Sequence, residues 1–85
     1  MEIKITIPEY SAAGGIQYNW ITGFEITALS GDRSVSIKAN KQGLLSLANH
    51  LLNLAQDAVP VGTHIHFDEH NSLETGSLDI LIEKS

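Results

Sequence analysis

The chain contains no cysteine among its 85 residues. Disulfide bonds, thiolate nucleophiles and zinc sites built on thiolates are therefore excluded. A chain of this length forms one small hydrophobic core, and here that core must stabilise the fold without covalent cross-links. No apolar run is long enough to span a bilayer, and the N-terminus "MEIKITIPEY" lacks the pattern of a signal peptide. We therefore expect a single domain, residues 1–85, located in the cytoplasm.

Basic residues are also scarce, with five against ten acids and a net charge of −5. Residues 1–56 carry four of each sign, whereas residues 57–85 carry six acids and a single base, Lys84. An acidic surface disfavours nucleic acid, whose phosphates need basic side chains opposite them. It suits a basic protein partner, because complementary charge steers the encounter. The same charge is also compatible with a surface that only keeps the protein soluble.

The periodicity of apolar residues predicts both strands and a helix. Alternation with a period of two predicts strands at residues 2–8, 20–29, 34–40, 62–70 and 78–84. Leucine and alanine at three- and four-residue spacing predict one helix, with Asn40 as its N-cap and Pro60 beyond its end. The apolar stripe of this helix comprises Leu44, Leu47, Ala48, Leu51, Leu54 and Ala55, widened by Leu45 and Leu52.

This order, βββαββ, predicts an α+β fold. We expect a mostly antiparallel sheet of about five strands, with the helix packed on one face through its leucines. The other face of the sheet would be open to water or to a partner. Gly43 near the start of the helix should cost roughly 1 kcal/mol relative to alanine. We expect Trp20 and Phe24 in the core or at its edge and His50 on the surface.

The run "HIHFDEH" is the most distinctive stretch of the sequence. Residues two apart in a strand point to the same side. The polar side would carry His64, His66, Asp68 and His70, and the opposite side would carry Ile65 and Phe67, facing the helix. Two imidazoles and a carboxylate suit zinc, so His64, His66 and Asp68 are a candidate metal site. We favour the other interpretation, in which these side chains lie on an exposed strand and take part in a protein contact or a local hydrogen-bond network.

Known catalytic patterns do not fit this run. The metallo-β-lactamase pattern is one residue shorter between its aspartate and its last histidine, and three alternating histidines would require His in place of Asp68. No serine lies in a nucleophile elbow, and no glycine-rich loop has the spacing of a phosphate site. The sequence therefore favours a binding protein over an enzyme, with no cofactor required.

Three segments carry a resemblance to a known family: "GLLSLANHLLNLAQ", "VPVGTHIHFDE" and "SLETGSLDILIEK". Together they span residues 43–84, which resemble the immunity protein 32 family of bacterial polymorphic toxin systems. The matching features are a helix opening with Gly-Leu, a Val-Pro link, a Gly-x-His-x-His strand, a Leu-Glu-x-Gly-Ser turn and a closing apolar strand. The resemblance implies a cytoplasmic protein that binds a cognate toxin and blocks it, without catalysis or an obligatory cofactor.

Three functional hypotheses follow from these observations. The first is an immunity protein that neutralises a cognate, basic toxin by direct occlusion. Its partner-binding residues would be His64, His66, Asp68, Glu69, His70, Glu74 and Asp79. The second is a metal-binding module or small metal-dependent enzyme, with zinc on His64, His66 and Asp68. The third is a structural module that forms a homodimer through the open sheet face. Nucleic acid and membrane are not expected as partners.

Overall fold

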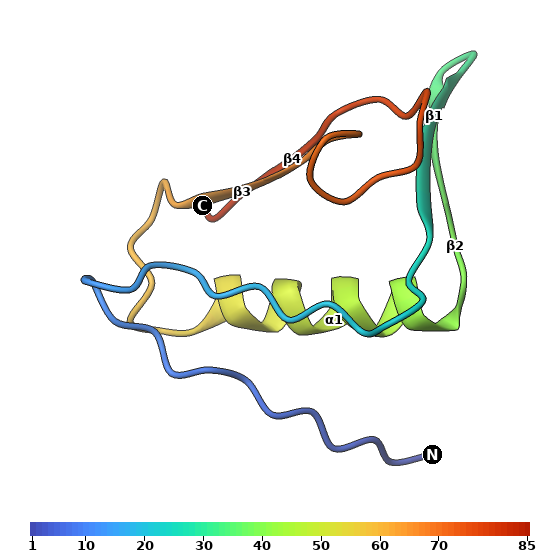
Figure 1. Cartoon of the computed structure of the whole chain (residues 1–85). Coiled ribbons are helices and arrows are strands. Elements are labelled where there is room, and N and C mark those ends of the chain that lie inside the picture. Colours follow the sequence, from blue (N-terminus) through green and yellow to red (C-terminus); the bar gives the residue numbers. More distant parts are fainter.

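A computed structural model describes all 85 residues and contains one helix and four strands in the order ββαββ (Figure 1). The elements are β1 (Ile26–Gly31), β2 (Ser34–Ala39), α1 (Lys41–Ala55), β3 (His64–Phe67) and β4 (Ile80–Glu83). They form two antiparallel sheets of two strands each, β1–β2 and β3–β4. The α+β prediction with one helix is confirmed, but the prediction of about five strands in one sheet is wrong. The helix falls short of the length and apolar character that a membrane-spanning helix needs.

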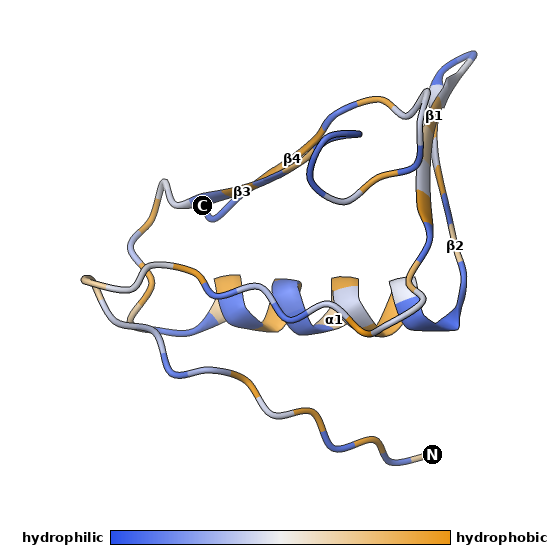
Figure 2. Cartoon of the chain, viewed as in Figure 1, coloured by the Kyte–Doolittle hydropathy of each residue, from blue (hydrophilic) through white to orange (hydrophobic).

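The first predicted strand, residues 2–8, is not formed. Its alternation of hydrophobic and hydrophilic residues is visible in Figure 2, but the segment lies on the side of α1 away from β3 and β4 and pairs with no strand. Side-chain amides of the helix bind its backbone instead. The Nδ2 of Asn49 donates to the carbonyl oxygen of Thr6 at 3.1 Å, and the Nε2 of Gln56 donates to that of Pro8 at 3.0 Å. Alternation alone cannot supply the neighbouring strand that a sheet requires.

Strands β1 and β2 form the predicted hairpin, which stands at the N-terminal end of α1 (Figure 1). Its turn holds Arg33 at φ 64°, a conformation that is uncommon for residues other than glycine. The outer edge of β2 carries no further strand. On this strand Val35 is 72% exposed and Ile37 is 48% exposed.

The other edge of β1 is covered by the loop between β3 and β4. The backbone N–H of Glu74 donates to the carbonyl oxygen of Ile26, and that of Leu78 donates to the carbonyl oxygen of Ala28, both at 2.8 Å. These two bonds tie residues 74–78 to β1 and so connect the two small sheets. The acidic loop after β3 is therefore anchored at its far end.

Helix α1 begins as predicted, with Asn40 as its N-cap. The Oδ1 of Asn40 accepts from the backbone N–H of Gly43 at 2.8 Å and from that of Glu25 at 2.9 Å. The second bond fixes the chain that enters β1 against the start of the helix. A cap that normally satisfies only its own helix here also joins two elements.

The buried face of α1 is mostly polar. Of the predicted apolar stripe, Leu54 is in the core and Leu47 packs against it, but the prediction is wrong for Leu44 and Leu51. The buried residues of the helix are Gly43, Ser46, Asn49, His50, Asn53 and Leu54. On the opposite side Leu44 is 56% exposed, Leu51 is 45% exposed and Leu52 is 49% exposed.

This orientation of α1 has a physical cause in the chain that lies against it. Residues 10–21 run alongside the helix with few backbone partners of their own (Figure 1). Buried backbone N–H groups must be hydrogen-bonded. The N–H of Ile21 donates to the Oγ of Ser46 at 2.9 Å, and the N–H of Tyr10 donates to the Oε1 of Gln56 at 3.0 Å. Polar side chains on this side of the helix therefore supply hydrogen-bond acceptors, which leucine side chains lack.

The apolar core lies between α1, β1 and β3. Its seven buried residues are Ile26, Ala28, Leu54, Val59, Ile65, Phe67 and Leu73. Trp20 and Phe24 are half-buried, pack against this core and stack on each other with ring centroids 4.4 Å apart. Their predicted place at the edge of the core is confirmed.

His50 is fully buried, and its predicted surface position is wrong. Its ring contacts Tyr18, Trp20 and Phe67, with centroids 5.1, 4.3 and 5.7 Å away. The Nε2 accepts from the backbone N–H of Asn19 at 3.1 Å, so the hydrogen of the neutral ring is on Nδ1, which has no partner. Burial lowers the pKa of His50 below its ordinary value, because a charged imidazolium is poorly solvated there.

Acidification is expected to destabilise the fold through His50. Because burial holds the pKa of His50 in the folded chain below 6.5, the unfolded chain takes up the proton first. The free energy of unfolding should therefore be at its highest value with respect to this group above about pH 6.5, and it should fall as the pH drops below that value. Tyr18 is the only titratable group among the rings that contact His50, and burial raises its pKa, so it stays neutral in this range.

Urea unfolding at about pH 7.5 and about pH 5 measures this effect. The His50→Gln variant keeps an acceptor for Asn19 and should show a smaller loss of stability on acidification than the parent chain. His64→Gln, at an exposed position, is the matched control and should keep the parent slope. An equal pH dependence in the parent and His50→Gln chains would contradict the assignment.

Gly43→Ala is expected to destabilise the protein, although alanine favours a helix by about 1 kcal/mol. A Cβ at this position would lie 2.6 Å from the carbonyl oxygen of Glu25 and 2.9 Å from the Cγ1 of Ile26. Such overpacking costs about 1–3 kcal/mol, which outweighs the gain in helix propensity. Thermal unfolding followed by circular dichroism tests this. Lys41→Ala, exposed in the first turn, should change stability by less than about 0.5 kcal/mol. A higher Tm for Gly43→Ala would show that the helix and β1 are not in close contact.

Candidate functional site

Strand β3 presents two histidines to the outside. His64 and His66 are exposed, whereas Ile65 and Phe67 between and after them are buried against the core. The predicted alternation is confirmed over these four residues. The pairing with β4 places Glu83 opposite His64 and Leu81 opposite His66, so an acidic side chain also lies beside the histidines.

The polar face does not continue beyond His66, because β3 ends at Phe67. Asp68 opens a turn instead. Its Oδ1 accepts from the backbone N–H of His70 at 2.8 Å and from that of Asn71 at 3.0 Å. The expectation that Asp68 and His70 share a strand face with His64 and His66 is therefore wrong. An aspartate that satisfies the N–H groups two and three residues ahead favours a turn over an extended strand.

The side chains of His64, His66 and Asp68 do not converge. No three histidine, aspartate or glutamate side chains of the chain are grouped so that they could hold a metal ion. One oxygen of the Asp68 carboxylate is engaged by the turn. The geometry therefore gives the zinc hypothesis no ligand set.

Besides Asp68, three acids of the predicted site lie in the loop from β3 to β4. Asp79 pairs with His66, with Oδ2 and Nε2 3.2 Å apart, and both side chains are exposed. The Oε2 of Glu69 accepts from the backbone N–H of Gly76 at 2.9 Å, which braces the loop across its middle. Glu74 is exposed, and only its backbone is engaged, with β1.

The single base of this region does not neutralise these acids. The Nζ of Lys84 donates to the carbonyl oxygens of Gln56 and Val59, at 2.7 and 2.8 Å. These carbonyls follow the C-terminal end of α1, where a cation is stabilised. The acids after β3 are therefore left without a nearby lysine or arginine partner.

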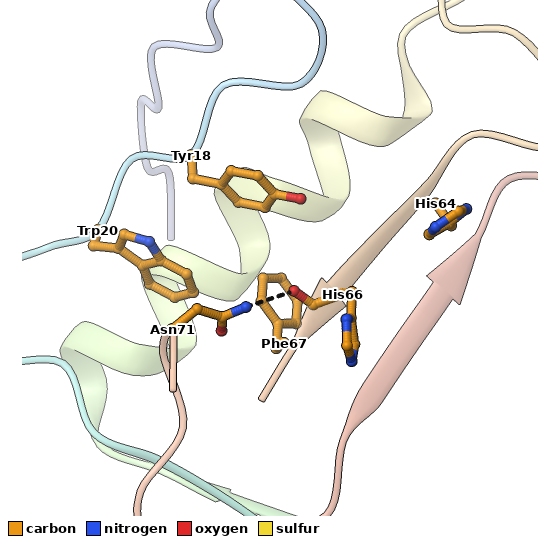
Figure 3. Close-up of a pocket in the computed structure, with 6 residues that line it drawn as sticks. All are labelled: Tyr18, Trp20, His64, His66, Phe67 and Asn71. Carbon is orange, nitrogen blue, oxygen red and sulfur yellow. Dashed lines mark hydrogen bonds between the residues drawn. The ribbon is translucent and has the colours of Figure 1, made fainter. Parts of the chain in front are cut away.

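A cavity of about 390 Å³ opens beside the histidines (Figure 3). Its lining comprises Tyr18, Trp20, His64, His66, Phe67 and Asn71. The rings of Tyr18 and Trp20 are nearly parallel, at 5°, and each is close to perpendicular to the ring of Phe67. The Nδ2 of Asn71 donates to the carbonyl oxygen of His66 at 3.1 Å and closes one side (Figure 3).

Sequence reasoning missed this cavity, since Tyr18 and Asn71 were not among the predicted site residues. The available signal was "YNW", which places two aromatic side chains two residues apart in an extended segment, in a chain with few aromatics. Burial raises the pKa of the Tyr18 phenol, so its hydroxyl remains protonated at neutral pH. The cavity thus combines aromatic faces with the polar groups of Tyr18, Asn71 and the two histidines, and the acids of the loop lie outside its lining.

The sequence of the chain matches one known protein family. The family model described as immunity protein 32 matches residues 34–85, which include β2, α1, β3 and β4. The chain belongs to the immunity protein 32 family. The resemblance over residues 43–84 is thereby confirmed and extends back to the start of β2. Comparisons with curated proteins and with solved structures gave no significant match.

The family match does not include all residues that line the cavity. Tyr18 and Trp20 lie before residue 34, whereas the remaining lining residues lie within the matched region. In this member of the immunity protein 32 family the cavity is therefore formed between the matched region and the N-terminal segment that α1 holds.

Asp68→Ala is expected to lower the free energy of unfolding by about 1 kcal/mol, because it removes the acceptor of the His70 N–H and leaves the Asn71 N–H only the backbone carbonyl oxygen of residue 68, 3.3 Å away. Asp68→Asn keeps an oxygen at the same place and should stay close to the parent chain. Urea unfolding and amide hydrogen exchange of residues 70 and 71 measure the effect. Equal stability of Asp68→Ala and the parent chain would show that the carboxylate does not support the turn.

Proposed function

We propose that this protein is a cytoplasmic immunity protein that binds a cognate toxin domain and blocks it by direct occlusion. Membership of the immunity protein 32 family supports a toxin as the partner. The observation that carries the proposal is a group of acids on β4 and on the loop from β3 to β4, most of them exposed and none paired with a lysine or an arginine. We call this the acidic face, and its residues are Asp68, Glu69, Glu74, Asp79 and Glu83.

The charge of this face selects a basic partner. Residues 57–85 carry six acids and one base, and that base, Lys84, is bound to backbone carbonyls. Complementary charge raises the association rate and rejects partners of the wrong sign. A toxin with a basic active-site cleft, as an enzyme that acts on nucleic acid requires, would be attracted to the acidic face and covered by it.

The loop that carries part of the acidic face is held in place before a partner binds, which favours affinity. Occlusion requires affinity and a surface that excludes substrate, and a few well-packed anchors supply most of the affinity. The loop that carries Glu69 and Glu74 is braced by its own hydrogen bonds and by β1, so little conformational entropy is lost when a partner binds. His64 and His66 lie beside this loop, and their exposed imidazoles can hydrogen-bond with a partner.

Charge reversal at two exposed acids tests this proposal. Glu74→Lys combined with Asp79→Lys should weaken toxin binding by about tenfold or more, because both side chains are exposed and the Glu74 side chain makes no hydrogen bond within the fold. Glu2→Lys combined with Glu9→Lys changes the net charge equally on the N-terminal segment and is the matched control.

The toxin is first obtained by pull-down from the source cells with a tag other than polyhistidine. Its affinity for each variant is then measured by calorimetry at low and high salt, together with inhibition of its activity. The proposal expects only the Glu74/Asp79 variant to lose affinity and inhibition. Unchanged affinity in that variant, or an equal loss in the control, would contradict binding through the acidic face.

A further inference from the structure

The aromatic cavity beside the acidic face has the features of a site for one particular side chain. Its volume of about 390 Å³ is at the small end of ligand-binding sites, so it takes a side chain or a small group. It opens next to His66, whose Nε2 is paired with Asp79 at 3.2 Å. The cavity therefore lies where the partner's positive charge is attracted.

The walls favour a planar cation. Tyr18 and Trp20 expose aromatic surface at the opening, and Phe67 closes the inner end (Figure 3). A cation over the face of tryptophan or tyrosine is stabilised by the ring quadrupole. A guanidinium gains more than an ammonium, because it is flat, stacks on the ring and is less strongly hydrated.

The polar groups at the cavity can accept hydrogen bonds from a ligand that carries several N–H donors. A guanidinium has five N–H donors and no acceptor. Around the cavity lie the Tyr18 hydroxyl and the imidazoles of His64 and His66 (Figure 3). The carboxylate of Asp79 lies outside the lining and is paired with His66. No lysine or arginine of the chain lines the cavity. An acidic side chain would be repelled by the surrounding acids, and an apolar one would leave these acceptors unpaired.

We propose that this cavity binds an arginine side chain of the toxin, which anchors the toxin on the acidic face. Tyr18 and Trp20 stack on the guanidinium, the Tyr18 hydroxyl and His64 accept its hydrogen bonds, and the nearby carboxylate of Asp79 attracts its charge. This inference rests on the proposed function, because the toxin supplies the arginine. It assigns the N-terminal segment, which lies outside the family match, a part in recognition.

The test uses the intact chain and small probes in place of the toxin. N-acetyl-arginine amide is titrated while the fluorescence of Trp20, the single tryptophan, is recorded. N-acetyl-citrulline amide has nearly the same shape as the arginine probe but no charge. N-acetyl-lysine amide carries a positive charge but has no planar guanidinium group. A saturable change is expected with the arginine probe, with affinity about tenfold higher than for the citrulline probe and about threefold higher than for the lysine probe.

Two variants at one position separate stacking from folding. Tyr18→Phe keeps the ring and should keep most of the affinity for the arginine probe. Tyr18→Leu removes the ring and should lower that affinity about fivefold, with thermal unfolding recorded to show that the chain remains folded. No saturable change with the arginine probe, or equal changes with the arginine and citrulline probes, would overturn the inference.

The outcomes for this cavity and for the immunity function are separable. A toxin that binds the parent chain and the folded Tyr18→Leu variant equally well would reject the arginine anchor and leave the immunity function standing. A parent chain that binds the arginine probe but neither binds nor inhibits the captured toxin would reject the immunity function instead. Loss of both probe and toxin affinity in Tyr18→Leu supports the anchor.

Discussion

Hydrogen bonds from the polar side of α1 hold the N-terminal third of the chain, which has no sheet of its own. Ser46, Asn49 and Gln56 bind backbone groups of residues 6–21, and His50 binds one more from inside the aromatic cluster. Each such bond left unmade in a buried place costs about 1–3 kcal/mol, a large share of the stability of so small a domain. The direction in which the helix faces is therefore set by these bonds, at the expense of exposing its leucines.

This arrangement also builds the proposed binding surface. The segment held by α1 brings Tyr18 and Trp20 over the edge of β3, where His64, His66 and Phe67 complete the cavity. The loop after β3 is fixed at both ends, by the carboxylate of Asp68 and by β1, and carries the acids that face outward. An aromatic cavity and an acidic face are thus adjacent and rigid, and both properties favour tight binding of a basic partner.

Local patterns in the sequence predicted local structure well. The cap at Asn40, the β1–β2 hairpin, the alternation of His64 to Phe67 and the concentration of acids after residue 57 each depend on neighbours in the chain. The family could also be recognised, since its features lie in one continuous stretch from α1 to β4.

The remaining features depend on partners far away in the sequence. Residues 2–8 alternate as a strand does, but they lie against the helix, where no strand is available. The burial of His50 and the exposure of Leu44 follow from a backbone that needs polar partners, which helical periodicity does not reveal. The cavity joins Tyr18 to Asn71, and neither residue alone carries a signal for such a site.

The central claim is that the toxin docks on the acidic face and the cavity beside it. Hydrogen–deuterium exchange of the chain with and without the captured toxin tests this most directly. The account predicts slower exchange of backbone amides in residues 64–83 and around Tyr18, with β2 and the exposed leucines of α1 unchanged. Protection confined to β2 or to the leucine side of α1, with residues 64–83 unaffected, would contradict it.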